Sequence, residues 1–118
     1  MQIGDTFYWG DGGHLWVVIS DPAQHAGEFI IVNLTHDLFR AGKECELNTG
    51  DHKWIYGKTY VAFGDAKKVL AADAVRLAKH IGSGMIHKHF PMKSNVLARI
   101  IAAAKKSRAL PTGFLDYL

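Results

Sequence analysis

The sequence predicts a mainly β domain of the α+β class, a small β-barrel followed by two short helices. Short apolar runs rich in β-branched and aromatic residues, such as Leu15–Ile19 and Phe29–Val32, are bounded by turn residues in the first part of the chain. Near residue 70 the apolar pattern changes to the period of a helix. A length of 118 residues with 48% hydrophobic composition suffices for one core, so we expect a single domain.

The strands are expected to follow one another closely in a meander. The turn Gly10–Gly13 is rich in residues that tolerate positive φ, and the segment 21–27 joins the second and third strands. A longer loop is expected at Asn48–Lys58. The expected strands are Gln2–Trp9, His14–Ser20, Glu28–Thr35, a weak one at Glu44–Leu47, and Tyr60–Phe63. Such spacing favours a barrel or a strongly bent sheet.

Two helices are expected after the strands. The first has Asp73 as N-cap and Gly82 as its end, and the second begins near Ser94. Lys105, Lys106 and Arg108 suit the negative C-terminal end of the second helix. The apolar face of the first consists of Ala74, Val75, Ala78 and Ile81, and that of the second of Val96, Leu97, Ile100, Ile101 and Ala104.

The single domain 1–118 therefore divides into a β-barrel part, 1–70, and a helical extension with a tail, 71–118. Pro111 and Gly113 end the regular structure, and the tail carries Phe114, Leu115, Tyr117 and Leu118. These side chains either pack on the core or occupy a partner's groove, and packing is the expectation.

Composition excludes several classes of protein. No apolar stretch is long enough for a membrane span, and the N-terminal residues lack the pattern of a signal peptide, so we expect a cytoplasmic protein without membrane contact. The single cysteine, Cys45, cannot form an internal disulfide.

Charge is distributed unevenly along the chain. Residues 1–66 carry four Lys/Arg and nine Asp/Glu, whereas residues 67–118 carry ten Lys/Arg and two Asp/Glu. A basic segment can attract a polyanion such as RNA or dock an acidic partner. The alternative is that these cations simply solvate the outer faces of two helices.

Several polar residues stand at the ends of the expected strands, where a scaffold usually offers functional groups. They are His14, Ser20, Thr35, His36 and Gly50–His52. In the loop that follows, Trp54 and Tyr56 lie between Lys53 and Lys58, which is typical of RNA contact because bases stack on aromatic rings. The same loop can instead be held to the barrel by its own hydrophobic side chains.

The first 66 residues resemble the PemK/MazF-like toxin family. The resemblance rests on Ile3–Trp9, His14–Pro22, Ile31–His36, and Gly50–His52 followed by Thr59–Val61. It implies an SH3-like barrel, often dimeric, that cuts messenger RNA without a metal and is neutralised by an antitoxin protein. Characterised members usually carry a basic residue, commonly Arg, near the start of the second strand and a Thr or Ser after the third. Here His14 and Thr35 hold these positions.

We therefore expect a metal-independent endoribonuclease acting on single-stranded RNA, with an acidic antitoxin and a second copy of the chain as candidate partners. Such cleavage needs a base, an acid and donors to the phosphoryl oxygens. The expected catalytic residues are His14, Thr35, His36 and His52, and the expected RNA-binding residues are Ser20, Lys53, Trp54, Tyr56 and Lys58. For His14, Thr35 and His52, a purely structural role is the alternative.

A metal or cofactor is not expected. His80 and the pair His87 and His89 could gather imidazoles, but no HExxH motif, cysteine pair or Asp cluster completes a recognised site. A second class of function stays open: a non-catalytic module that retains the small barrel and binds nucleic acid or a protein.

Overall fold

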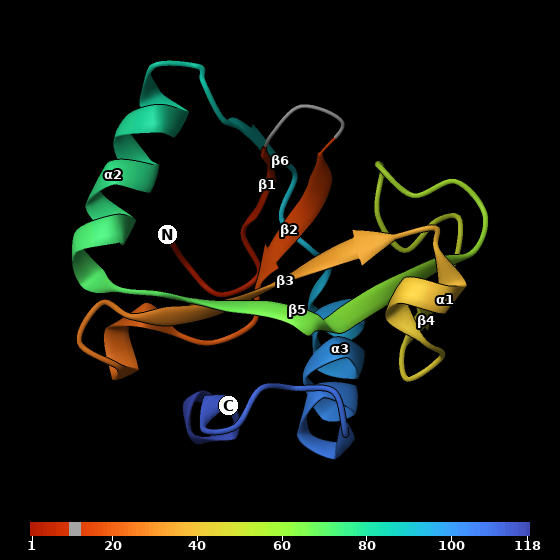
Figure 1. Cartoon of the computed structure of the whole chain (residues 1–118). Coiled ribbons are helices and arrows are strands. Elements are labelled where there is room, and N and C mark those ends of the chain that lie inside the picture. The colour runs from red at the N-terminus through yellow and green to blue at the C-terminus, as the bar shows by residue number, and fades with distance from the viewer. Residues whose placement is uncertain (10–12) are drawn as a thin grey trace.

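Six strands form one antiparallel sheet in the order β4-β5-β3-β2-β1-β6 (Figure 1). The structure is a computed structural model that describes residues 1–9 and 13–118. The strands are β1 (Thr6–Trp9), β2 (His14–Val18), β3 (Phe29–Thr35), β4 (Glu46–Leu47), β5 (Thr59–Val69) and β6 (His87–His89). The helices are α1 (Leu38–Ala41), α2 (Ala71–Gly82) and α3 (Ser94–Lys106), with 3-10 helices at η1 (Pro22–Gln24) and η2 (Phe114–Tyr117).

The sheet is open. Its end strands, β4 and β6, have two and three residues, and no pairing joins them in the described parts of the chain. The prediction of an α+β fold with a β-rich first part is confirmed, whereas closure into an SH3-like barrel is not. Edge strands this short offer few backbone groups with which to close a barrel.

A large irregularity in β5 bends the sheet. Ile31 of β3 pairs with Lys67, and Asn33 pairs with Ala62, so two steps along β3 correspond to five along β5. The extra residues bulge out of the ladder around Gly64. The strand is therefore much longer than the expected Tyr60–Phe63, because it continues past the bulge as far as Val69.

Side-chain alternation gives the sheet two apolar faces. Leu15 and Val17 pack with Ile100 of α3, and this side is called the α3 face. Trp16 packs with Leu77 of α2 on the opposite side of the sheet, and this side is called the α2 face. Figure 1 shows the two helices on different sides of the sheet. Neighbouring residues of one strand therefore serve different surfaces.

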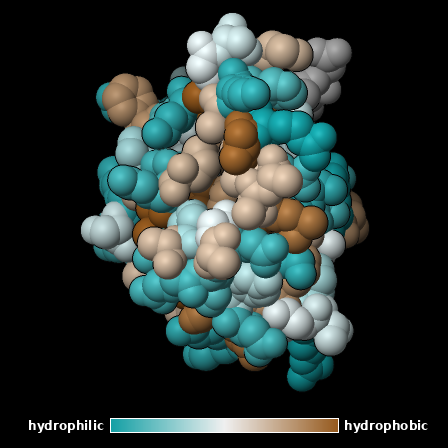
Figure 2. Space-filling view, turned by 90° about the vertical axis from the view of Figure 1, so that its left-hand side faces the viewer, coloured by the Kyte–Doolittle hydropathy of each residue, from teal (hydrophilic) through white to brown (hydrophobic). Residues whose placement is uncertain are grey.

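Helix α2 differs from the prediction in its start and its buried face. It begins at Ala71 rather than after Asp73, which lies in the first turn and pairs with Arg76. Leu77 is the buried residue, whereas Val75 is 60% exposed. The inward stripe follows Ala74, Leu77 and Ile81 instead of the predicted set with Val75 and Ala78, because positions three and four apart share a face. Viewed from this side, hydrophobic surface is interspersed with hydrophilic residues (Figure 2).

Other elements agree with the sequence or were not predicted. The second helix, with Val96, Ile100 and Ala104 buried, is confirmed. The tail packs on the α3 face through Phe114, Tyr117 and Leu118, although Leu115 is 54% exposed. Helix α1 and strand β6 were not predicted as such. Residues 10–12 of the predicted turn Gly10–Gly13 lie outside the described residues.

Candidate functional site

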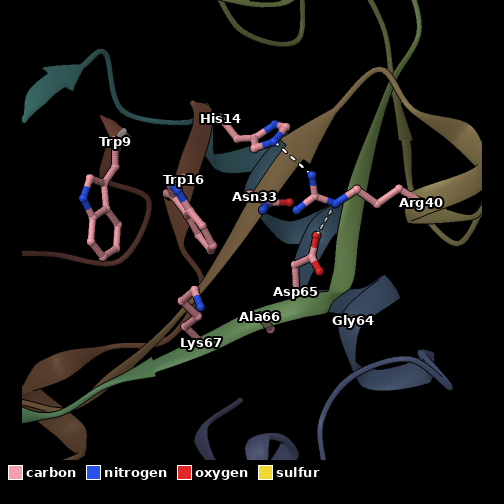
Figure 3. A pocket seen from close by; sticks show the side chains of 9 residues that line it. All are labelled: Trp9, His14, Trp16, Asn33, Arg40, Gly64, Asp65, Ala66 and Lys67. Atoms are coloured by element: carbon pink, nitrogen blue, oxygen red, sulfur yellow. Dashed lines mark hydrogen bonds and ion pairs between the residues drawn. The ribbon is translucent and has the colours of Figure 1, made fainter. Parts of the chain in front are cut away.

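A pocket opens on the α2 face where β5 leaves the ladder. Its volume is about 470 Å³, and it lies beside the directly paired residues Trp16 and Asn33 of β2 and β3. The lining side chains come from four strands and from α1 (Figure 3). They are Trp9, His14, Trp16, Asn33, Arg40, Gly64, Asp65, Ala66 and Lys67. The bulge carries the backbone of β5 away from β3 at this point, and polar side chains line the gap that results.

The polar end of this pocket is a chain of hydrogen bonds. The Nδ1 atom of His14 lies 3.2 Å from the carbonyl oxygen of Leu34, which can only accept, so Nδ1 carries the proton. The other ring nitrogen, Nε2, accepts from Nη1 of Arg40 at 3.1 Å. The Nε atom of Arg40 donates to Oδ2 of Asp65 at 2.8 Å. Both nitrogens of the His14 ring are therefore engaged, and its orientation is fixed.

Arg40 reaches the pocket because of a capped turn after β3. The Oδ1 atom of Asp37 accepts from the backbone N–H of Phe39 and Arg40, and Oγ1 of Thr35 accepts from the N–H of Asp37. Ala41 packs α1 against β5. The Arg40 and Asp65 side chains are 45% and 34% exposed, so their ion pair contributes only about 0–1 kcal/mol and a phosphate can displace it at small cost.

An aromatic wall and a row of cations extend the pocket. Trp9 is 46% exposed, and its ring centroid lies 6.2 Å from that of the buried Trp16. Trp9 and Lys67 also line a second hollow of about 420 Å³ beneath α2. The cationic side chains there are Lys67 and Arg76, of which Arg76 pairs with Asp73 in the same hollow, whereas the Lys68 ammonium lies over the ring of Tyr117 on the α3 face. Together the two hollows form a groove, called the α2 groove below, that combines positive charge with exposed aromatic surface.

Part of the basic C-terminal segment serves the fold. Nζ of Lys93 donates to the carbonyl of Gly50, and Arg99 lies 3.3 Å from Asp51 and donates to the carbonyl of Glu46. Lys93, at the N-cap of α3, and Arg99 within α3 thus hold the loop after β4. In the α2 groove Arg40 and Arg76 are also ion-paired, with Asp65 and Asp73, whereas the Lys67 ammonium has no hydrogen bond or ion pair within the described residues and is the better candidate for an external polyanion.

The histidines predicted to act together are separated by the sheet. The side chains of Tyr8 and Trp9, neighbours in β1, point to opposite faces of the sheet. Trp9 contacts Trp16 on the α2 face. The Tyr8 ring lies on the α3 face, with its centroid 6.4 Å from that of Trp54. His36 stacks on Trp54 at 5.8 Å, so it belongs to this group around Trp54, called the second cluster below, and not to the pocket of His14.

His52 also belongs to the second cluster and holds it together. Its ring is buried, with Nε2 donating to the carbonyl of Phe90 at 2.7 Å and Nδ1 accepting from the N–H of Trp54 at 3.0 Å. Burial, and then the nearby charges of His52 and His87, lower the pKa of His89 beside it. Both ring nitrogens of His52 form hydrogen bonds with backbone groups, as expected for the purely structural role that was the alternative to catalysis.

The predicted RNA-binding residues gather largely around that same cluster. Lys53 lies 3.9 Å above the ring of Phe90, and Tyr56 is 78% exposed and lines, together with Trp54, a hollow of about 460 Å³. Lys58 contributes its carbonyl, which accepts from His36 at 3.1 Å.

Two other predicted residues support the backbone. Ser20 is buried, and its Oγ accepts from the N–H of Ile30 at 2.7 Å. Thr35 is buried beside Asp37, as described above. Neither hydroxyl is among the atoms that line the pocket of His14.

Sequence reasoning missed Arg40, Asp65, Asn33 and Lys67 as members of the site. Arg40 and Asp65 are far from His14 along the chain, and no local pattern joins them. One signal was present: Asn33 is a lone amide inside the apolar run Phe29–Leu34. The residue is 1% exposed, and Oδ1 has no hydrogen-bond partner among the described residues.

Neither a metal-binding group of side chains nor a membrane-spanning helix occurs in the described parts of the chain. Within residues 1–9 and 13–118, no three or more His, Cys, Asp or Glu side chains are grouped so as to hold a metal ion. No helix of the described chain has the length and apolarity that crossing a membrane requires.

Comparison with protein-family models, with curated proteins and with solved structures found no match to this chain.

Proposed function

We propose that this protein binds single-stranded RNA in the α2 groove and cleaves it without a metal ion, as its resemblance to PemK/MazF-like toxins implies. The observation that carries the proposal is the contact of 3.1 Å between Nη1 of Arg40 and Nε2 of His14 in a groove that also holds Trp9 and Lys67. The family resemblance calls for a guanidinium near the start of the second strand. Arg40 supplies one there from a different element.

In the proposed reaction, Arg40 turns from His14 to the scissile phosphate and frees Nε2. That nitrogen accepts the proton of the 2′-hydroxyl, and the 2′-oxygen attacks phosphorus. The bond from phosphorus to the 5′-oxygen breaks, and the Lys67 ammonium gives that oxygen a proton. The products are a 2′,3′-cyclic phosphate and a 5′-hydroxyl. Arg40 stabilises the charge on the transferring phosphoryl group, and Asp65 positions the guanidinium.

The expected SH3-like barrel and toxin role belong to this proposal, with the strands forming an open, bent version of the small barrel. Lys67 and Arg76 would give an acidic antitoxin a surface that overlaps the RNA groove. Such a partner would inhibit by occupying the cations that hold the phosphates.

A second candidate function is a non-catalytic RNA-binding module. It is favoured by one observation: both ring nitrogens of His14 are engaged, by Leu34 and Arg40, so no free base faces the pocket. In this case the groove holds RNA through the same cations and aromatic rings without moving a proton.

The test is to incubate the pure protein with mixed-sequence single-stranded RNA in EDTA and to follow cleavage and binding separately. We expect cleavage by the wild type, a loss of about 10²-fold or more in His14→Gln, and a similar loss in Arg40→Gln. His87→Gln, which changes an exposed histidine of β6 outside the groove, is the matched control and should keep full activity.

The outcomes separate the candidates. Binding without cleavage from pH 5 to 9 would replace the ribonuclease with the binding module. Cleavage that survives His14→Gln but is lost in His36→Gln would move the active site to the second cluster. Absence of both binding and cleavage in folded protein would overturn both functions.

A further inference from the structure

Asn33 is the one buried side chain in the described structure whose polar atom is left without a partner. It sits in the middle of β3, opposite Trp16 on β2 and Ala62 on β5, and lines the pocket of His14. Buried polar atoms are nearly always hydrogen-bonded, and exceptions call for a functional reason. An unpaired oxygen beside a pocket is positioned to accept from a bound molecule.

The neighbouring groups do not use this oxygen. Arg40 spends Nη1 on His14 and Nε on Asp65. Figure 3 shows the Asn33 side chain between the Trp16 ring and the Arg40 guanidinium. The positive guanidinium favours the amide oxygen, and not the amide NH₂ group, on the side that faces it.

The surroundings fit one nucleotide. The exposed face of Trp9 can stack a base, Arg40 and Lys67 can hold its phosphates, and Asn33 lies beside the buried Trp16 where the edge of that base would point. A volume of about 470 Å³ lies within the range of small-molecule pockets.

We propose that Asn33 reads the edge of a base stacked on Trp9, with Oδ1 accepting from an exocyclic amino group and the amide nitrogen donating to the adjacent ring nitrogen. Adenine and cytosine present this donor beside an acceptor, whereas uracil and guanine present a carbonyl beside an N–H. The inference rests on the proposed binding of RNA in the α2 groove and adds that the groove selects adenine or cytosine.

The test uses fluorescently labelled RNA hexamers of uridine with a single central adenosine, cytidine or guanosine, and the all-uridine hexamer as reference. Their dissociation constants are measured by anisotropy in EDTA with the His14→Gln variant, which prevents cleavage. We expect the hexamer with adenosine or cytidine to bind about tenfold tighter than all-uridine RNA. Guanosine should give no such gain.

Two additional changes in that background separate base reading from general affinity. Asn33→Leu should reduce the preference to less than about twofold while all-uridine RNA binds as before. Lys67→Ala should weaken binding of every hexamer by a similar factor and keep the preference, because it acts on phosphate.

A further variant guards against simple misfolding. Asn33→Asp replaces the amide with two acceptor oxygens, which match the two N–H donors on the edge of guanine, so the preference should move toward the guanosine hexamer. A gain of this kind cannot come from loss of structure.

The inference is overturned if the preference survives Asn33→Leu, or if the starting protein prefers guanosine or shows no preference among hexamers that bind. Failure of every hexamer to bind would overturn the proposed function as well. These results differ, so failure of the base-reading role is distinguishable from failure of the RNA-binding proposal.

Discussion

Replacing Asn33 by leucine should stabilise the protein, because it removes a buried acceptor that has no partner among the described residues. Leucine keeps the number and branching of the heavy atoms. A buried unsatisfied polar group costs about 1–3 kcal/mol, and this cost disappears in Asn33→Leu. Trp16 and Ala62, which pair with Asn33 on the two neighbouring strands, give the leucine side chain apolar neighbours. For a domain of this size, the gain corresponds to a rise in melting temperature of about 4–12 °C.

The matched control is Thr35→Val, a shape-conserving change two residues further along the same strand. Thr35 is also buried, but its Oγ1 accepts from the N–H of Asp37 at 3.1 Å. Its removal deletes that hydrogen bond at the exposed residue Asp37, where water can replace the hydroxyl, and should destabilise by about 0.5–1.5 kcal/mol. Two similar polar-to-apolar changes in β3 therefore have opposite expected signs.

Thermal unfolding followed by circular dichroism, with urea unfolding as a second measurement, checks both variants under identical conditions. If Asn33→Leu lowers the melting temperature as Thr35→Val does, then Asn33 makes stabilising hydrogen bonds and the reasoning is refuted. Greater stability together with lost RNA discrimination would mark Asn33 as a residue kept for function at a cost in stability.

Three further predictions concern the histidines and the cysteine. His52→Ala removes two hydrogen bonds from a buried ring and should lower the free energy of unfolding, measured with urea, by about 2–4 kcal/mol. His36→Ala, at an exposed residue, should lower it by less than about 1 kcal/mol. Equal losses in the two variants would contradict this difference. Burial, followed by the charges of His52 and His87, lowers the pKa of His89 from 6.5, so the unfolded chain binds its proton more readily. The stability that neutral His89 contributes is present above about pH 6.5 and is lost as the pH falls through its lowered pKa in the folded protein. His89→Asn should therefore flatten the decline in unfolding free energy from pH 7 to 5. An unchanged slope would argue against this role of His89. Burial is the main cause that raises the pKa of Cys45 to about 11. Its thiol should therefore resist a disulfide reagent at pH 8 until urea unfolds the protein. Rapid labelling of the native protein would disprove this protection.

The strands were predictable where the apolar pattern of the local sequence matches the burial of the strand in the folded protein. The runs around Val17 and Ile31 are apolar because both faces of β2 and β3 are covered, by α2 on one side and α3 on the other. The length of β5 was not predictable, because the polar residues after Phe63 form a bulge whose pairing depends on β3. Helix α1 is too short for periodicity to indicate it.

The candidate site was predictable only in part. His14 was found because it precedes a strong apolar strand, and it lies in the pocket. Its expected partners His36 and His52 were chosen from their places at loop and strand ends. Strand alternation sends Tyr8 of β1 to the α3 face, where the loop residue Trp54 lies against it, and a sequence without known pairing cannot give that direction.

The sequence by itself determined the β-rich first part, the helical second part, the two apolar faces of the central strands and the uneven charge, because each depends on composition or on a local period. Only the tertiary structure decided that Arg40 contacts His14, that Asp65 holds Arg40, and that Asn33 is left without a partner beside the same pocket. Those contacts join residues that are distant in the chain, and they depend on the register of β3 with β5 and on the bulge between them. Register is a property of paired strands, so no single segment encodes it.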